Sequence, residues 1–579
     1  MKLSEALAAI QRRQGADPVH THYLVCGCQP LHLGTFLQAH LLERGSNSGI
    51  KVETGLYGDF AGNLLRAAQS SAIAAAAVLE WADIDPRLGL RSAGGWTASA
   101  KDDTLAASKA RFARVLDAVA QLAALMPVAF CPPALPLPPL GHTPGCQASV
   151  FELDLAERLA SFLARLGRLP GVRLIHAAHL ESLAPGVPRL DPKMELAAGF
   201  PYTLPFASAL AEALAGMLHP APPKKGLITD LDDTLWSGIV GEIGPDAVSW
   251  RQETYTQTHG LYQQMLGHLA GCGVLLGACS KNEPEPVRGA LARPDLYFAP
   301  SVLFPVEVSW GPKSQGVARI LEAWNIAPEA VVFVDDNPME LAEVERVFPT
   351  ITCLRFSGND PARVWELLQQ LRDYFGKPSL SEEDRLRAAS LRAAGDMRRE
   401  AKLADPDEFL RALRGKVVLG YGRDPSDARP LDLINKTNQF NLNGERIGEA
   451  EWKRMLEADG AILSVASYED RFGPLGKIAA LVASLHGERR LRVSHWAMSC
   501  RAFSRRIEHH TLESLFRKTN ADEIVFDFRP TPRNGPLQEF LAAIGALPGD
   551  GASCRITRTA FASALAGGGL PHEVVEEAG

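Results

Sequence analysis

The sequence predicts a multidomain α/β protein with a parallel sheet at the centre of its middle domain. Apolar runs of strand length alternate with stretches of helical periodicity over most of the 579 residues, which is the pattern of β-α-β units. Several runs end abruptly in carboxylates or hydroxyls, as strands do at the ligand-binding edge of an open α/β sheet. A proline-rich stretch at residues 219–223 interrupts the alternation and marks a domain boundary.

Composition and charge narrow the class of protein. With 46% hydrophobic and 22% charged residues, the chain can bury several cores of ordinary size. A net charge of −7 and a pI near 6.1 disfavour nucleic acid as a partner. No apolar run approaches the roughly 18 residues of a membrane helix, and residues 1–17 lack the apolar core of a signal peptide. Because the nine cysteines show no paired spacing and indicate reduced thiols, we expect a cytoplasmic protein without membrane contact.

The first predicted domain covers residues 1–218 and alternates strands with helices. Strand-like runs occupy residues 22–25, 72–79 and 127–131, and helical spacing occupies residues 33–43, 106–125 and 151–166. Cys26 and Cys28 follow the first strand, where we favour a structural role over metal binding.

The middle domain, residues 222–376, carries the most informative chemistry. Its first strand-like run, residues 226–229, is followed by three carboxylates at Asp230, Asp232 and Asp233. Carboxylates this close repel one another unless a cation lies between them. Mg²⁺, held by one or two carboxylates with water and phosphate oxygens, is the usual cation. The alternative is an acidic turn that merely closes a strand.

Two more strand-like runs end in polar side chains. Residues 273–279 are followed by a hydroxyl, a cation and an amide, which suit phosphate binding: Ser280, Lys281 and Asn282. Residues 331–334 end at an acidic pair, Asp335 and Asp336, and Lys313 opens a helical stretch between the two runs. Because parallel strands end at one edge of a sheet, these groups should face the first acidic tip.

The order of these clusters resembles the haloacid dehalogenase (HAD) superfamily of phosphotransferases, and four motifs in order are a specific signal. Four segments are similar to the corresponding motifs of the FkbH-like family of polyketide pathways: DLDDTLWSGIVGE, GACSKNE, WGPKS and VFVDDNPME. The resemblance spans nearly the whole chain. It implies a glyceryltransferase/phosphatase that dephosphorylates 1,3-bisphosphoglycerate and loads the glyceryl unit onto an acyl carrier protein. The alternatives are a Mg²⁺-dependent phosphatase of a small metabolite and a scaffold that recruits carrier proteins.

The resemblance also assigns roles within a HAD-like core. Asp230 is the expected nucleophile and Asp232 the acid/base, while Thr234 stiffens their loop. The expected ligands of Mg²⁺ are Asp230, the main-chain carbonyl of Asp232, and Asp335 or Asp336. The expected phosphate contacts come from Ser280 and Lys313, with Lys281 and Asn282 extending the grip or contacting the glyceryl part.

The spacing between the motifs leaves no room for a large cap domain. Residues 235–279 and 281–312 must already hold strands and helices of the core. An uncapped site is open to macromolecules, which suits a substrate presented by a carrier protein. Uncapped phosphatases that act on proteins or large ligands fit the same observation.

In FkbH-like proteins the first domain resembles an SGNH hydrolase, whose catalytic residues are missing here. Residues 27–29 stand where the Gly-Asp-Ser block is expected, and Met194 stands where the histidine after Asp191 is expected. We therefore expect a non-hydrolytic scaffold or docking domain. The other candidate bases are two isolated histidines, His142 and His176.

The predicted linker, residues 377–415, has a charged part at residues 381–414 that should form a solvated helix pair. The final domain, residues 416–579, shows three strands and a helix at residues 461–468, 478–485, 491–498 and 505–517. This order resembles a GNAT-like α+β acyltransferase fold. Ser504 and Arg506 replace the glycines of its coenzyme A loop, so we do not expect coenzyme A binding.

Four blocks of the final domain match the FkbH-like family, at residues 435–441, 470–473, 498–501 and 531–534. Their polar groups either bind a ligand or satisfy the backbones of loops. Arginines also gather in this domain, which suits either an acidic carrier protein or a solvated face: Arg489, Arg490, Arg492, Arg501, Arg505 and Arg506.

A glyceryl thioester requires a thiol relay, because an aspartate accepts phosphoryl but does not preserve an activated acyl group. Cys279 precedes Ser280 at a strand tip, where Lys281 and Mg²⁺ would lower the pKa of the thiol. Strand alternation could instead turn Cys279 into the core. The rival is Cys500, next to Arg501. We expect the adduct on Cys279, because the acyl phosphate must react where its phosphate is bound.

Overall fold

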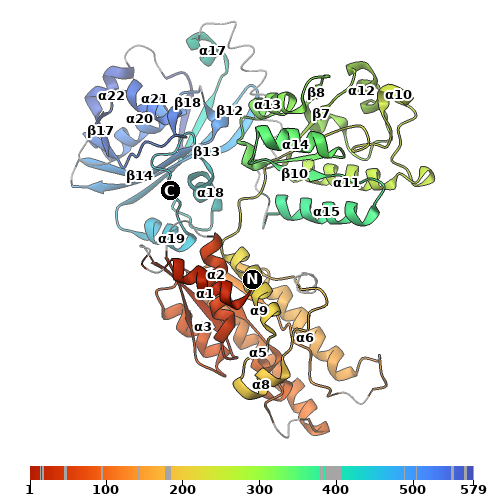
Figure 1. Cartoon of the computed structure of the whole chain (residues 1–579). Coiled ribbons are helices and arrows are strands. Elements are labelled where there is room, and N and C mark those ends of the chain that lie inside the picture. Colours follow the sequence, from red (N-terminus) through yellow and green to blue (C-terminus); the bar gives the residue numbers. More distant parts are fainter. Residues whose placement is uncertain are drawn as a thin grey trace. The chain divides into compact units, whose positions relative to one another are not determined.

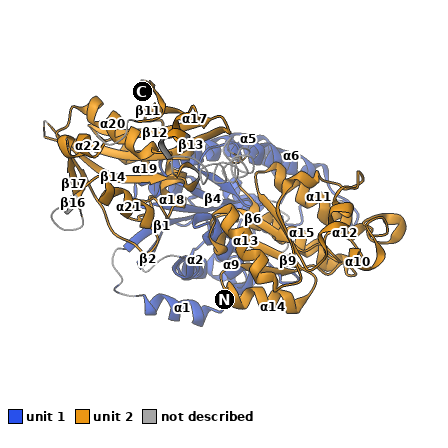
Figure 2. Ribbon diagram, turned by 90° about the horizontal axis from the view of Figure 1, so that it is seen from above, with its two compact units in different colours: residues 1–221, 448–451 blue, residues 222–447, 452–579 orange. Residues whose placement is uncertain are grey.

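The computed structural model divides into two compact units, residues 1–221 with 448–451, and residues 222–447 with 452–579 (Figure 2). The structure describes every residue except 14, 16–18, 45–48, 93–95, 141–142, 177–183, 378–379, 381–383, 385–405, 488, 504, 549–552, 566–569 and 578–579. Most of the expected helix pair at 381–414, like His142, lies outside the described residues, and α17 (Pro406–Ala412) is its described helical part.

The sheet of the first unit has the order β2-β1-β3-β4-β5 and is parallel in every pair. Figure 1 draws this unit in red to yellow. Its strands are β1 (Val19–Cys26), β2 (Gly49–Thr54), β3 (Ala74–Val78), β4 (Val128–Cys131) and β5 (Val172–Leu174). Its helices are α1 (Leu3–Arg12), α2 (Leu31–Arg44), α3 (Phe60–Gln69), α4 (Trp81–Ile84), η1 (Pro86–Leu88), α5 (Ala98–Leu125), α6 (Val150–Leu166), α8 (Pro192–Ala198) and α9 (Leu204–Leu218). The predicted α/β alternation is confirmed.

Helices cover both faces of this sheet. Ala74 and Ala76 of β3 pack in a cluster with α1, α2 and α9, whereas Ala75 and Ala77 pack with α3, α5 and α6. A strand buried on both faces has a continuous apolar sequence rather than an alternating one. The continuous apolar run at residues 72–79 therefore indicated a strand. The SGNH-like assignment of this unit stays a prediction.

The second unit contains a five-stranded sheet of order β10-β9-β6-β7-β8, also parallel in every pair. Its strands are β6 (Gly226–Thr229), β7 (Leu275–Ser280), β8 (Leu303–Val308), β9 (Val331–Asp335) and β10 (Thr352–Arg355). The strands predicted before the three polar clusters are therefore confirmed. Because β6 lies between β9 and β7, the carboxyl ends of neighbouring strands bring the clusters to one edge.

Six helices and three short turns complete this α/β half. They are α10 (Val240–Ile243), η2 (Gln252–Thr254), α11 (Gln257–Gly271), α12 (Pro284–Leu291), η3 (Pro300–Val302), α13 (Lys313–Trp324), η4 (Pro328–Ala330), α14 (Pro338–Val347) and α15 (Pro361–Phe375). Residues 230–274, all of them described, hold only α10, η2 and α11 between β6 and β7. No separate cap domain is inserted in that stretch.

The segment of residues 232–250, which we call the flap, leaves the end of β6 and returns toward α11. Ser237 and Ser249 pair across it in an antiparallel bridge, with backbone hydrogen bonds of 2.8 and 3.1 Å. At its near end the Asp233 carboxylate accepts from the backbone amide of Gly238 at 2.7 Å. These contacts make the flap a closed hairpin-like loop.

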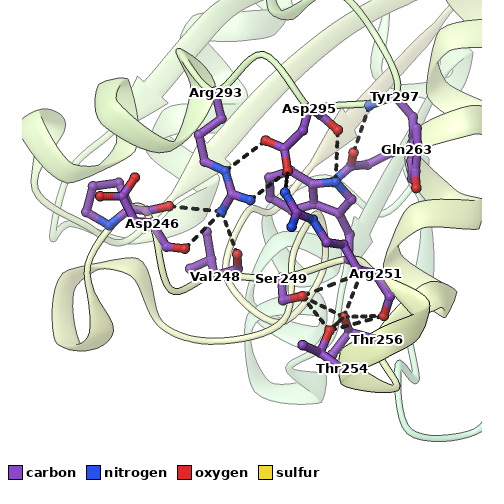
Figure 3. A network of polar contacts seen from close by, with 12 residues as sticks. Asp246, Val248, Ser249, Arg251, Thr254, Thr256, Gln263, Arg293, Asp295 and Tyr297 are labelled. Carbon is purple, nitrogen blue, oxygen red and sulfur yellow. Dashed lines mark hydrogen bonds and ion pairs between the residues drawn. The ribbon is translucent and has the colours of Figure 1, made fainter.

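The far end of the flap is anchored by Arg293, which follows α12 (Figure 3). Its guanidinium lies 4.1 Å from the centre of the Trp250 ring and donates to the carbonyl of Val248 at 2.6 Å. Asp295 accepts from both Arg293 and Arg251, and its carbonyl accepts from the indole of Trp250 at 3.1 Å. The flap is therefore tied to the connection between β7 and β8.

The same unit holds an eight-stranded mixed sheet of order β16-β17-β15-β14-β13-β12-β11-β18. Its strands are β11 (Lys416–Gly420), β12 (Ala461–Asp470), β13 (Gly473–His486), β14 (Arg490–Met498), β15 (Glu523–Phe526), β16 (Leu547–Pro548), β17 (Cys554–Thr557) and β18 (Glu573–Glu577). Its helices are α18 (Ala428–Lys436), α19 (Glu449–Glu457), η5 (Cys500–Ala502), α20 (Ile507–Thr519), α21 (Gly535–Ala543) and α22 (Arg558–Leu565).

The predicted order of three strands and a helix is confirmed as β12-β13-β14-α20. The helix begins at Ile507 rather than at residue 505, because Arg506 takes a left-handed conformation with φ 57°. The GNAT-like assignment stays a prediction. Over the described part of the chain, no helix combines the length and the apolar character that crossing a membrane requires.

Candidate active site

Three carboxylates converge where β6 and β9 end. Asp230 follows β6, Asp335 is the last residue of β9, and Asp336 begins the next loop. One carboxylate oxygen from each lies within 4.8 Å of those of the other two. The two acidic tips that the sequence predicts to face each other therefore form a single cluster.

Lys313 places its ammonium group inside this cluster. It opens α13, and its side chain is 5% exposed. Its Nζ lies 2.9 Å from Oδ1 of Asp230 and 2.5 Å from Oδ2 of Asp335. Burial lowers the pKa of Lys313, but the two carboxylates outweigh burial and the net shift is upward. The lysine therefore stays charged and holds the two carboxylates together.

The cluster remains short of positive charge. Burial raises the pKa of Asp230 to about 7, and burial also raises the pKa values of Asp335 and Asp336. Because one ammonium group balances only one carboxylate, the three ionise together only when a further cation is present. A divalent cation with a preference for oxygen ligands would balance them, and the three carboxylates fit Mg²⁺.

Thr234 joins the two acidic tips. Its hydroxyl accepts from the backbone amide of Asp336 at 3.1 Å, and its carbonyl oxygen lies 3.1 Å from Nδ1 of His259. The loop after β6 is thereby fixed to the loop after β9 and to α11. Thr234 has the stiffening role expected of it, whereas a direct contact with phosphate stays a prediction.

The side chain of Asp232 stands outside the group of three carboxylates. It accepts hydrogen bonds from Trp236, Val240 and Asn282. Burial raises the pKa of Asp232. Only its main-chain carbonyl was expected to hold metal, so this placement agrees with an acid/base role for the carboxyl.

The polar residues at the end of β7 have different partners from those expected. Ser280 is the last residue of the strand and is buried at the edge that carries the cluster. Lys281 makes an ion pair with Glu340 of α14 at 2.7 Å. Asn282 donates to Asp232 at 2.7 Å. The structure therefore gives Lys281 and Asn282 partners within the protein, which the sequence did not reveal.

Cys279 does not have the properties expected of a relay thiol. Its side chain is 4% exposed, and its Sγ faces the carbonyl oxygen of Lys313 at 3.5 Å and packs beside Gly316. Burial raises the pKa of this thiol to about 12. The expected low pKa is wrong, because alternation along β7 turns Cys279 into the apolar cluster with Ile320 and Trp324.

Cys500 lies elsewhere in the second unit. It is the first residue of η5, directly after β14, and is only partly buried. The structure therefore reverses the order of the two cysteines as relay candidates on grounds of exposure.

The corresponding edge of the first unit shows no hydrolase triad among the described residues. Asp191 accepts from the backbone amide of Met194 at 3.0 Å and so caps α8. The pKa of Cys28 is raised well above its usual value, through its hydrogen bond with Cys26 and through burial. The non-hydrolytic role expected for this domain stays a prediction.

The family blocks of the final domain mostly satisfy loops. Asn435 pairs through its side chain with both backbone groups of Ile447, at 2.8 Å each. Asn534 donates to the carbonyls of Asn441 and Arg529 at 3.1 and 3.0 Å. Of the two interpretations of these blocks, the contacts fit the one in which the polar groups satisfy loop backbones, and not the one in which they bind a ligand.

The arginines of the final domain do not make a free cationic face. Four of them form ion pairs, which join Arg489 to Asp522, Arg490 to Glu523, Arg492 to Asp527 and Arg505 to Asp470. Neighbouring acids therefore balance much of the positive charge from which the sequence suggested an acidic partner.

No protein-family model and no curated protein matches this chain. Among solved structures, the chain is similar to the N-terminal part of the protein BF1531 from Bacteroides fragilis, which contains a phosphatase domain and is complexed with Mg. The TM-score is 0.49 at 17% identity, and the match covers 66% of this chain and 100% of that one. A likeness at this level decides neither fold nor function, which rest on the residues described above.

Proposed function

We propose that this chain is a Mg²⁺-dependent phosphatase or phosphotransferase of the HAD type, with Asp230 as its nucleophile. The observation that carries the proposal is the cluster of Asp230, Asp335 and Asp336, in which Lys313 pairs with the two buried carboxylates, Asp230 and Asp335. Such a cluster holds negative charge at high cost, and a divalent cation bound beside it would offset that charge. Mg²⁺, when bound there, cancels the repulsion between Asp230 and the incoming phosphate.

The protein's own residues then supply two steps. An oxygen of Asp230 forms a bond to phosphorus while the bond from phosphorus to the leaving oxygen breaks, and Asp232 gives that oxygen a proton. Water next attacks the aspartyl phosphate, Asp232 takes the proton of that water, and phosphate departs with Asp230 restored. Lys313 holds the phosphoryl oxygens and the attacking carboxylate through both steps.

For the substrate, we propose 1,3-bisphosphoglycerate, with an acyl carrier protein as acceptor of the glyceryl unit. The similarity of the four motifs to the FkbH-like family supports this choice. The lack of an inserted cap in residues 230–274 also supports it, because a carrier-borne thiol needs an open approach. A phosphatase of a small metabolite would use the same site for phosphate release alone. Loading the carrier also requires a thiol to attack the acyl carbon and expel the 1-phosphate, while Asp230 removes the 3-phosphate and water then restores Asp230.

The experiment that tests the site compares Asp230→Asn with Asp233→Asn. Both changes remove one carboxylate of the same motif, but Asp233 is exposed and outside the cluster. Asparagine tolerates its φ of 50°, and the Oδ1 of asparagine can still accept from the backbone amide of Gly238. We expect Asp230→Asn to lower Mg²⁺-dependent phosphate release by about a thousandfold or more, and chelation of Mg²⁺ to do the same to the wild type. Near-normal turnover by Asp230→Asn would remove the basis of the proposal.

The acceptor is tested by the intact mass of the carrier. Incubation of wild-type protein with 1,3-bisphosphoglycerate, Mg²⁺ and a candidate carrier protein should add a glyceryl group to the carrier. Phosphate release without acylation of a cognate carrier would favour the phosphatase.

A further inference from the structure

Three donors hold the carboxylate of Asp232. The indole N–H of Trp236 donates to its Oδ1 at 2.8 Å, and the backbone amide of Val240 donates to the same oxygen at 3.1 Å. The side-chain amide of Asn282 donates to Oδ2 at 2.7 Å. Both oxygens are thereby oriented by the protein, and the donors come from two separate loops.

The orientation of the Asn282 amide is set by its other end. Its Oδ1 accepts from the backbone amide of Glu283 at 3.1 Å, so its NH2 group is the part that faces Asp232. The residue is 2% exposed. It lies just after Ser280, on the loop that leaves β7, and so connects the end of that strand to the acid/base.

The other two donors belong to the flap, which is fixed at both ends. Asp233 and Gly238 close its near end, and the stacking of Arg293 on Trp250 holds its far end. Trp236, which is fully buried, contributes its N–H from inside this loop. The flap thus acts as a rigid support for Asp232, and precise support of this kind is what acid/base chemistry requires.

We propose that Asn282, acting with Trp236, is a positioning residue that aims the Asp232 carboxyl at the leaving and attacking oxygens. The inference rests on the proposed function, in which Asp232 moves the proton in both steps. It gives Asn282 a task different from the contact with phosphate or glyceryl that the sequence suggested.

A positioning role makes a prediction that a purely structural role does not. When the leaving group is an alcohol, its oxygen needs a proton as the bond to phosphorus breaks, and general acid catalysis is worth roughly 10² to 10⁴ in rate. When the leaving group is acetate, the oxygen departs with the bonding electron pair as a stable anion and needs no proton. A misoriented Asp232 should therefore slow phosphoryl transfer to Asp230 when the leaving group is an alcohol. When the leaving group is acetate, the rate of that transfer should stay nearly unchanged.

The test measures kcat/KM for glycerol 3-phosphate and for acetyl phosphate, both with Mg²⁺, in the full-length protein. Asn282→Leu keeps the approximate volume of the side chain and removes the N–H donor to Asp232 without placing a charge beside it. We expect kcat/KM to fall about a hundredfold for glycerol 3-phosphate and less than about fivefold for acetyl phosphate. Trp236→Phe should shift the two substrates in the same unequal way. Trp324→Phe, which removes an indole donor to Phe304 in the same domain, should leave the ratio of the two values unchanged.

A second readout concerns hydrolysis of the aspartyl phosphate, in which Asp232 must take a proton from water. With acetyl phosphate, Asn282→Leu should accumulate a phosphoryl adduct that is visible by intact mass after acid quenching, and Asp230→Asn should form none. Equal losses on both substrates without an adduct would overturn the positioning role. A wild-type protein that releases phosphate from neither substrate would overturn the proposed function, and the inference with it.

Discussion

The two parallel five-stranded sheets both carry buried acids at their carboxyl ends, but they compensate them in opposite ways. In the first unit, Glu80 follows β3 and Asp83 lies in α4, whereas Asp230 and Asp335 mark the ends of β6 and β9 in the second unit. Burial raises the pKa of all four carboxyls. The difference lies in the groups that surround each acid.

In the first unit each acid has neutral donors. Glu80 accepts from the hydroxyl of Tyr202 at 2.8 Å and from the backbone amides of Ala134 and Leu135 at 3.3 and 3.2 Å. Asp83 accepts from the backbone amide of Glu80 at 2.9 Å. Burial raises the pKa of Glu80 to about 8 and that of Asp83 to about 7. Near neutral pH these acids retain protons for much of the time and serve as hydrogen-bonding groups.

In the second unit the acids converge on one another and share a cation. Lys313 pairs with Asp230 and Asp335, Asp336 lies beside them, and one ammonium group cannot balance all three carboxylates when they are ionised. In this protein, acids at the end of a parallel sheet form a candidate site where they converge and have too few positively charged or donor groups around them. Acids that each receive their own donors only hold loops in place.

The strongest test of this comparison removes the shared cation. Lys313→Ala should lower kcat/KM for phosphate release by about a hundredfold to a thousandfold, because a buried charge that contacts the nucleophile is lost. The matched control is Lys224→Ala in the same domain, whose ammonium group donates to the carbonyl of Glu329 at 2.7 Å. Its activity should stay within about twofold of wild type. Equal activity of the two variants would show that the cluster is not the reaction centre.

The sequence revealed the parts of this site that belong to strand ends. Asp230, Ser280 and Asp335 each follow or close an apolar run, and a parallel sheet brings such ends together whatever the side chains do. The helix α15 was also predictable, because Asp360 caps it and Pro361 occupies its first turn.

The parts that the sequence did not reveal depend on contacts between distant loops. Neither the hydrogen bond from Asn282 to Asp232 nor the ion pair of Lys281 with Glu340 follows from any local pattern. The direction of the Cys279 side chain could have been predicted from the sequence. If Ser280 faces the site, its neighbour on the strand must face the other way.

The thiols extend the comparison, because Cys279 in the second unit and Cys28 in the first both lie near the end of a strand and both have raised pKa values. Burial raises the pKa of Cys279 to about 12, and the pKa of Cys28 is raised well above its usual value. After incubation with 1,3-bisphosphoglycerate and digestion, we now expect the glyceryl adduct on Cys500. Cys279→Ala should retain carrier loading within about twofold, whereas Cys500→Ala should lose about tenfold or more.

The matched control for reactivity is Cys146, which is exposed. Iodoacetamide should label Cys146 much faster than Cys279 or Cys28, because the thiolate is the reactive form. A glyceryl adduct on Cys279, or loss of carrier loading in Cys279→Ala with phosphate release intact, would restore Cys279 as the relay.

The smallest expected effect is a pH dependence of the stability of the first unit. Its direction follows from the raised pKa of Glu80. The folded pKa of about 8 lies above the usual glutamate value of 4.5, so the folded protein retains a proton that the unfolded chain has lost. The stabilisation from this proton is complete below pH 4.5 and is lost as the pH rises through about 8. In that interval the free energy of unfolding should decrease by up to about 1.4 kcal/mol per pH unit from this group.

Glu80→Gln should remove that dependence, because glutamine has no proton to lose. The hydroxyl of Tyr202 can accept as well as donate, so the new amide can hydrogen-bond to it while its carbonyl accepts from the backbone amides of Ala134 and Leu135. Thermal unfolding of the full-length protein at pH 5 to 9 should therefore show that the Tm of Glu80→Gln increases relative to the wild-type Tm by a few degrees as the pH rises. Parallel curves would mean that Glu80 is ionised in the folded protein, and the contrast between the two sheet edges would then fail.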